Sequence, residues 1–217
     1  MKIKFIVAAV MLLSLRLYSQ DYFPGDNELL LMPTAYTMPQ GNSYFSDYEL
    51  MLLNYSYAVT SSTHLSVFSF FPVTTQFYES ITFGFKQKII TYKSLQSALY
   101  GTFTPKGSIF SVGDVVSIGE VHHSVHGSLA YMKLVEDAKP FWIFMLGYRI
   151  DPSEKSSIML EYELVTSSYE SGSAGMITIG FRIRSANMSW ELAGMRPLQY
   201  SGDLLFMPLL KAGYYFN

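Results

Sequence analysis

The stretch "GMITIGFRIRSANMSWELAG", residues 175–194, decides the fold because its apolar and polar residues alternate strictly. Isoleucine or phenylalanine stands at every second position from 177 to 183, with threonine, glycine and arginine between them. After a short polar break, Met188, Trp190 and Leu192 repeat the pattern. A period of two indicates β-strands that are apolar on one face and polar on the other. The apolar face needs either a protein core or a lipid bilayer beside it.

The same alternation recurs along most of the chain, and no stretch has the convincing spacing of an amphipathic helix. Twelve strands are expected. Ten is the alternative, because the segment 28–36 contains Pro33 and the alternation between 104 and 126 is poor. The expected strands are 28–36, 43–59, 64–72, 79–91, 95–104, 111–121, 127–134, 140–150, 156–165, 175–184, 188–195 and 206–216.

Three features favour an all-β fold that is a closed antiparallel transmembrane β-barrel. Only 15% of the residues are charged and 16% are aromatic, whereas about a quarter of a typical soluble domain is charged. The strands run to about ten residues, the length that crosses hydrocarbon when tilted. Glycines such as Gly147 and Gly180 lie on the polar face, where a narrow lumen needs space. The alternative is a soluble secreted β-sandwich or a lipocalin-like binding protein.

Closure of the barrel has two consequences for the strands. The last strand is expected to pair with the first, because lipid tolerates no open sheet edge. Short turns are expected at the end that holds both termini, which is the periplasmic end of an outer-membrane barrel.

The beginning of the chain has the layout of a secretory signal peptide. Two lysines precede an apolar run from Phe5 to Leu15, which is too short for a transmembrane helix. The expected cleavage site follows Ser19 or Gln20. The chain is therefore expected to consist of a signal peptide at 1–20 and a barrel at 21–217, and the expected location is the outer membrane of the cell.

The overall composition excludes several classes of function. The formal net charge is −2 and no basic run is present, so nucleic acid is not an expected partner. The chain has no cysteine, and disulfides therefore do not hold the fold. No motif for a cofactor is present. The expected partners are outer-membrane lipid and the barrel assembly machinery, with a small solute as a further candidate.

Several short motifs resemble a family of uncharacterised outer-membrane β-barrel proteins from Bacteroidota and related bacteria. A Pro-Thr pair, a glycine turn, a Tyr-Phe-x-Asp-Tyr-Glu stretch and an Ala-Val-Thr turn follow one another in residues 29–67. The stretches "FMLGYRID", "SIMLEYEL" and "FMPLLKAGYYFN" are similar to later strands of the same family. The resemblance implies the fold and the location, and it implies no activity. The residues that carry the first motifs are Pro33, Thr34, Gly41, Tyr44, Phe45, Asp47, Tyr48, Glu49, Ala58, Val59 and Thr60.

The polar face of the strands carries charges that should line the lumen. Two interpretations are open: a salt-bridge lattice that fills a narrow barrel, or a charged constriction that selects solutes. The tight turn at 185–187 is expected to place Arg182 opposite Ser189, with Glu191 as its diagonal neighbour. The expected lumen charges are Lys86, Lys88, Arg149, Glu161, Glu163, Arg182, Arg184, Glu191 and Lys211.

The stretch "EVHHSVHGS", residues 120–128, gathers three of the four histidines. Its plainest interpretation is a polar turn with exposed histidines. A metal site is an alternative, with Glu120, His122, His123 and His126 as ligands. A lipid hydrolase is another, because His122 and Ser124 resemble the His-x-Ser pair of outer-membrane lipid hydrolases, as base and nucleophile. No residue is assigned as catalytic or metal-binding on this pattern alone.

Three classes of function follow from the sequence. The first is a narrow pore or conduit for small solutes. The second is a structural barrel with a salt-bridged or plugged lumen that acts through partners. The third is the lipid hydrolase that uses His122 and Ser124, so the chain is expected not to be an enzyme unless that pair is active.

Overall fold

The structure of the chain is a computed structural model. It describes residues 22–49, 51–71, 77–107, 109–120, 123–134, 140–167, 173–199 and 206–216. The expected signal peptide lies outside the described residues.

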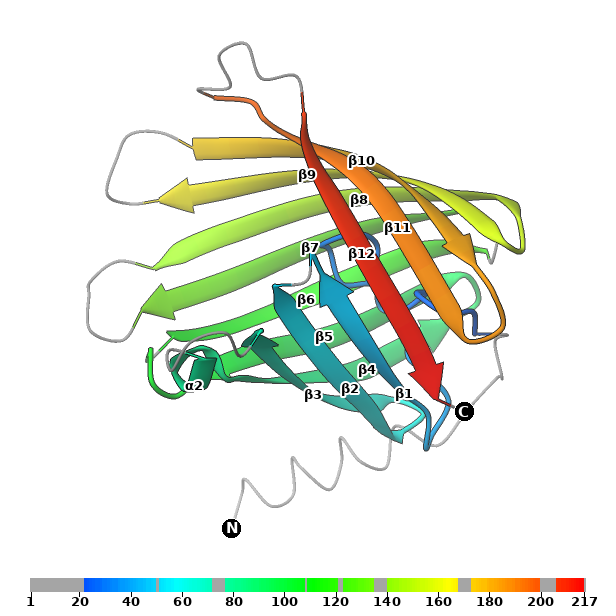
Figure 1. The fold of residues 1–217 in the computed structure, drawn as a ribbon, viewed down its shortest axis with the longest axis horizontal. Coiled ribbons are helices and arrows are strands. Elements are labelled where there is room, and N and C mark those ends of the chain that lie inside the picture. Colours follow the sequence, from blue (N-terminus) through cyan, green and yellow to red (C-terminus); the bar gives the residue numbers. More distant parts are fainter. Residues whose placement is uncertain are drawn as a thin grey trace.

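The described strands form one closed antiparallel barrel in which each strand pairs with its sequence neighbours and the twelfth pairs with the first (Figure 1). The expected fold class and the expected number of strands are therefore confirmed. The strands are β1 Ser43–Tyr48, β2 Leu52–Thr60, β3 Thr63–Phe70, β4 Thr82–Tyr92, β5 Leu95–Thr104, β6 Ile109–Glu120, β7 His123–Leu134, β8 Phe141–Ser153, β9 Ser156–Ser167, β10 Ser173–Arg184, β11 Met188–Pro197 and β12 Met207–Phe216.

The alternation seen in the sequence separates the outer and inner faces of the barrel. In β10, Ile179 and Phe181 are 48% and 43% exposed, whereas Arg182 between Phe181 and Ile183 is fully buried. The same split holds in β4, where Phe83 and Phe85 face outward. A belt of exposed isoleucine, leucine, phenylalanine and tyrosine surrounds a serine-rich polar interior, as in transmembrane barrels. The belt is the surface that lipid would cover.

Helix contributes little to this fold. The described residues contain the short helix α2, Phe77–Ser80, between β3 and β4. No helix among the described residues is long and apolar enough to span a membrane.

The two ends of the barrel differ in their connections. At the end where Ser43 of β1 pairs with Phe216 of β12, the connections are two or three residues long. At the opposite end the connections are longer, except for the turn at 49–51 between β1 and β2. The short turns thus lie at the end that carries the C-terminal strand end, as expected for the periplasmic side. They are 61–62, 93–94, 121–122, 154–155 and 185–187.

The expected first strand at 28–36 is wrong. These residues lie inside the barrel and contribute one isolated bridge, between Glu28 and Pro33. The count of twelve survives because the expected strand 43–59 is two strands, β1 and β2. They are separated by a turn in which Glu49 has a φ of 57°.

The composition of residues 28–36 explains why they leave the wall of the barrel. Four consecutive apolar residues, 29–32, have no alternation and cannot divide themselves between lipid and lumen. Pro33 lacks the N–H that a central strand needs. Leu29, Leu30 and Met32 are all fully buried and form a hydrophobic cluster within the barrel. The lumen therefore has an apolar core of its own.

The expected register of the β10–β11 hairpin is also wrong. Arg182 lies directly opposite Glu191, and Arg184 lies opposite Ser189. Ser185 donates its N–H to the Met188 carbonyl at 2.7 Å, so only two residues form the turn. Because the turn is formed by residues 186–187, the pairing lies two residues further along β11 than expected. The arginine and the glutamate become direct cross-strand neighbours.

Candidate functional site

Residues 22–42, called the inner segment below, run inside the barrel (blue in Figure 1). Its apolar side chains are buried against the inner wall. A methyl group at Gly180 of β10 would come within 2.7 Å of the Leu30 side chain, and Gly147 of β8 lies beside Leu29 and Met32. These two glycines therefore make room for the inner segment.

The inner segment turns tightly at residues 29–32, where Leu29 donates its N–H to the Met32 carbonyl at 2.9 Å. The following N–H groups of Leu30, Leu31 and Met32 all point at the carboxylate of Glu161 on β9, at 2.7, 3.1 and 3.2 Å. Successive backbone N–H groups of this kind form an anion-binding concavity. The Glu161 carboxylate therefore binds the backbone of this turn.

Arg182 on β10 binds the carbonyl side of the same segment. Its guanidinium donates to the carbonyls of Gly25, Glu28 and Leu29 at 2.8, 3.0 and 2.8 Å. Its Nε donates to Glu191 Oε1 at 2.9 Å. Because the planar guanidinium carries five donors, one side chain can join the wall to three points of the backbone. Gly25 itself has a φ of 93°, which favours glycine.

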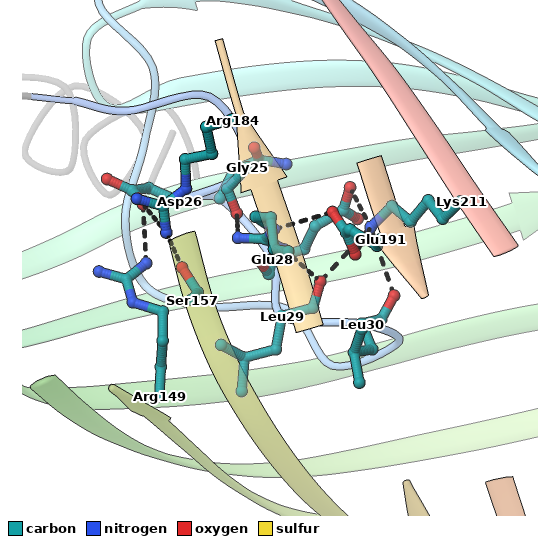
Figure 2. A network of polar contacts seen from close by, with 12 residues as sticks. Gly25, Asp26, Glu28, Leu29, Leu30, Arg149, Ser157, Arg184, Glu191 and Lys211 are labelled. Carbon is teal, nitrogen blue, oxygen red and sulfur yellow. Dashed lines mark hydrogen bonds and ion pairs between the residues drawn. The ribbon is translucent and has the colours of Figure 1, made fainter. Parts of the chain in front are cut away.

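Lys211 on β12 completes this group (Figure 2). Its Nζ lies 2.9 Å from Glu28 Oε1 and 3.5 Å from Glu191 Oε2. It also donates to the carbonyls of Leu29 and Leu30 at 3.4 and 3.3 Å. Glu28 accepts a further hydrogen bond from the Tyr48 hydroxyl at 3.0 Å. The inner segment thus contributes a carboxylate as well as backbone groups.

Lys86 on β4 binds the segment from the opposite wall. Its Nζ donates to the carbonyls of Asn27, Thr34 and Tyr36 at 2.8, 3.0 and 2.9 Å. His64 on β3 accepts the N–H of Met38 at 2.8 Å through Nε2. Polar side chains from both sides of the barrel therefore hold the inner segment.

A second group of charges surrounds Asp26 (Figure 2). Asp26 accepts a hydrogen bond from Arg149 on β8 at 2.7 Å, and Arg184 lies 3.9 Å away. Arg184 also pairs with Asp151 at 3.3 Å and bonds Ser157. All five side chains are buried. This group lies nearer the short-turn end than the group around Lys211.

The buried charges balance only when the inner segment is included. Among the described wall residues, five buried cations stand against three buried carboxylates. Asp26 and Glu28 of the inner segment supply the two missing negative charges. The wall alone would carry a formal excess of two positive charges. The wall cations are Lys86, Arg149, Arg182, Arg184 and Lys211, and the wall carboxylates are Asp151, Glu161 and Glu191.

Most of the expected lumen charges lie in this arrangement, and two do not. Lys88 and Glu163 are only half-buried. Neither forms an ion pair with another described residue. The strand alternation places both on the polar face, but it gives no information about which charges the inner segment reaches. The other seven expected charges contact the inner segment or pair with a residue that does.

The histidine cluster is divided by the strand alternation. His123 on β7 is exposed, whereas His126 is fully buried. His122 and the side chain of Glu120 lie outside the described part of the chain. Across the described residues, no group of three histidine, aspartate or glutamate side chains could hold a metal ion.

Ser124 pairs with His126, while the expected partner His122 lies outside the described residues. Its Oγ lies 2.8 Å from His126 Nε2, and His126 Nδ1 lies 2.7 Å from Ser117 Oγ. Ser117 in turn accepts the N–H of Ala35 at 2.8 Å, and the Tyr36 ring stands edge-on to the imidazole at 5.7 Å. The pair therefore faces the inner segment.

Sequence reasoning missed the functional part played by the inner segment and its carboxylates. The signal that could have found them is the density of strand breakers before β1. Pro24, Gly25, Pro33, Pro39 and Gly41 interrupt a stretch that is otherwise apolar enough for a strand. Such a stretch is better explained as irregular backbone that fills a barrel than as part of its wall.

Comparisons with known proteins leave the function open. No family model matches the chain, and no curated protein matches it. Among solved structures, OmpT of Vibrio cholerae is 11% identical over 76% of this chain and 64% of its own, with a TM-score of 0.41. An anion-selective porin from Comamonas acidovorans is 14% identical over 76% and 59%, with a TM-score of 0.42.

LpxR from Salmonella typhimurium is 8% identical over 81% of this chain and 99% of its own, with a TM-score of 0.48. The chain thus spans less than two thirds of the first two proteins and nearly all of the third. The matched proteins include porins, and the shared property is the fold.

Proposed function

We propose that the protein is an outer-membrane β-barrel whose lumen is closed at rest by the inner segment. It is a structural barrel with a salt-bridged lumen and not an open pore. The observation that carries the proposal is the binding of one short backbone stretch by Lys86, Glu161, Arg182 and Lys211. These four residues, called the anchor residues below, come from four different strands.

The energetics support a closed resting state. Hydrogen bonds to charged groups stabilise a structure by about 1.5–3 kcal/mol each, and an unpaired buried charge costs more. Withdrawing the inner segment would remove the bonds that all four anchor residues make to its backbone, leaving Arg182 and Lys211 their contacts with Glu191. It would also expose the apolar cluster around Leu29 and Leu30. A mobile gate would need weaker contacts than these.

Lipid on the outside and the assembly machinery during insertion are the partners that this proposal requires. The exposed apolar belt supports the first. The short turns and the aromatic end of β12, with Tyr214 and Phe216, support the second. The proposed location is the outer membrane, reached through an N-terminal signal peptide.

Conductance of the refolded protein in planar bilayers tests the closed lumen. The wild-type chain is expected to give no current steps, while a variant that lacks residues 22–40 is expected to give them. Regular steps from the wild type would overturn the proposal. Heat-modifiable migration in a gel establishes that each sample is folded.

The buried Ser124–His126 pair favours a role in holding the inner segment over lipid hydrolysis. The pair faces Ala35 and Tyr36, away from the lipid belt. Incubation with phospholipid vesicles is expected to release no fatty acid above a protein-free blank, for the wild type and for Ser124→Ala alike. Release by the wild type that disappears in Ser124→Ala would establish the enzyme.

A further inference from the structure

A cavity of about 240 Å³ lies between the inner segment and the wall formed by β1–β5. For comparison, an apolar cavity of about 150 Å³ accepts a benzene molecule. The cavity can therefore hold a ligand of one substituted ring. Its floor is formed by Leu31 and Pro33 of the inner segment, and the ring of Phe68 lies on its wall.

The charged groups at this cavity already have hydrogen-bond partners. Glu28 binds Lys211 at 2.9 Å and the Tyr48 hydroxyl at 3.0 Å. The Lys86 ammonium donates to three backbone carbonyls and has three hydrogens to give. A charged ligand would lose its hydration, and the Lys86 hydrogens that an anion would need are already bound to carbonyls. The cavity thus selects an uncharged molecule.

Hydroxyl groups give the cavity a limited polar capacity. Ser66 lines it, and a methyl group at the facing Gly84 would collide with the Ser66 hydroxyl. The hydroxyls of Tyr100 and Thr102 each bond a neighbouring serine, at 2.7 and 2.6 Å. Each hydroxyl has a second lone pair or a hydrogen to offer. One or two polar atoms of a ligand can be satisfied, but a ring with many hydroxyls cannot.

The wall beside this cavity includes β1, the shortest of the described strands. β1 has six residues, so it spans about 14 Å of the membrane at a tilt of ~45°, against an apolar band of about 25 Å. β8 has thirteen residues and spans about 30 Å on the same basis. Tyr48, the last residue of β1, lines the cavity. Tyr44 lines it as well, so the cavity extends along β1 up to the level where that strand ends.

β12 extends beyond the end of β1, so the first residues of β12 have no strand partner on that side. Their sequence fits this position. The last pair between β12 and β1 is Lys211 with Tyr48, and Glu49 donates its N–H to the Leu210 carbonyl. Backbone groups of residues two apart point to the same side, so those of Pro208 also point toward β1. Pro208 has no N–H, so this residue presents no backbone donor toward β1.

We propose that this cavity binds a small, uncharged, mainly apolar ring compound with a single hydroxyl or carbonyl group, which partitions into the bilayer and reaches the cavity above the end of β1. The size of the cavity, its paired charges and its few free hydroxyls set the chemical class. Binding needs the inner segment in place and does not need the lumen to conduct.

Calorimetric titration of the detergent-refolded protein with four matched rings tests the proposal. The rings are cyclohexanol, cyclohexanecarboxylate, protonated cyclohexylamine and myo-inositol, with protein-free micelles as the blank. Cyclohexanol is expected to bind at one saturable site, and the two charged rings and the inositol at least about tenfold more weakly, a difference of about 1.4 kcal/mol. Equal binding of all four, or no saturable binding of cyclohexanol, would overturn the proposal.

A cavity-filling variant places the binding in this cavity. Ser66→Leu is expected to weaken cyclohexanol binding at least about tenfold. Val67→Leu is the matched control, because Val67 is the next residue of β3 and is 41% exposed on the lipid face. If Ser66→Leu gives no heat-modifiable band, the smaller Ser66→Val serves in its place. Unchanged binding in the folded filling variant contradicts the proposal, whether or not the wild type conducts.

Discussion

Arg182 lies directly opposite Glu191 in the β10–β11 pair, with 2.9 Å between Nε and Oε1. This ion pair uses one edge of the guanidinium and leaves the other nitrogens to three carbonyls of the inner segment. The same side chain therefore belongs to the wall and to its contents. In this barrel, the residues that form the salt-bridge lattice also bind the segment that fills the lumen.

The geometry of Arg182 predicts that lysine cannot replace it. A lysine ammonium has three donors on a flexible stem and cannot reach the carboxylate and three carbonyls together. Arg182→Lys is expected to lower the free energy of unfolding in urea by about 2–4 kcal/mol. The half-buried control Arg196→Lys on β11 is expected to change it by less than about 0.5 kcal/mol. Equal stability of Arg182→Lys and the wild type would remove Arg182 as an anchor residue.

The hydrogen bonds from the inner segment to Glu161 predict that this carboxylate helps to hold the segment in the barrel. Glu161→Gln removes the charge that three N–H groups bind, and it is expected to weaken the contact by about 1.5–3 kcal/mol. The chain has no cysteine, so Ala35→Cys provides a single buried thiol on the inner segment. Maleimide labelling of that thiol is expected to become at least about tenfold faster when Glu161→Gln is added.

The control for this experiment lies two residues along the same strand. Glu163 is on the same face of β9 and is half-buried, and it has no hydrogen bond to the described inner segment. Glu163→Gln is expected to leave the labelling rate unchanged. If both substitutions accelerate labelling equally, the effect comes from the loss of lumen charge and not from the bond to the turn.

The backbone conformation of Gly25 predicts that other residues are poorly tolerated at this position of the inner segment. Its φ of 93° is unfavourable for any other residue, and a methyl group would come within 2.7 Å of the Arg182 guanidinium. Gly25→Ala is therefore expected to cost about 1–2 kcal/mol of stability and to lower the temperature of the gel-shift transition. Gly127→Ala is the control, because its methyl group would meet only the Leu146 side chain at 3.9 Å. A transition that is equally low in both variants would contradict the role of Gly25.

The alternation of residues such as Ile179, Phe181 and Arg182 predicted the barrel because a strand in lipid must sort its side chains by face. The inner segment could not be predicted in the same way, since residues 29–32 have no period and bind mainly through their backbone. The register of Arg182 depended on which two residues form the turn: 186–187 place it opposite Glu191, whereas 185–186 would place it opposite Ser189. The spacing of apolar and polar residues in the sequence does not show which residues form the turn. The pairing of Ser124 with His126 followed from side-chain alternation, which puts residues two apart on one face.

The balance of buried charges predicts the selectivity of an opened barrel. The described wall carries five buried cations and three buried carboxylates, and the inner segment supplies the remaining two carboxylates. A variant that lacks residues 22–40 removes Asp26 and Glu28 and leaves the lumen with an excess of positive charge. Rings of positive side chains favour anions. The reversal potential in a potassium chloride gradient is therefore expected to lie on the chloride side.

Adding Lys211→Gln and Arg149→Gln to the deletion is expected to move that potential toward zero, whereas exchanging the exposed Lys155 for glutamine is expected not to move it. A cation-selective current from the deletion variant would show that the buried wall charges do not set the field in the lumen.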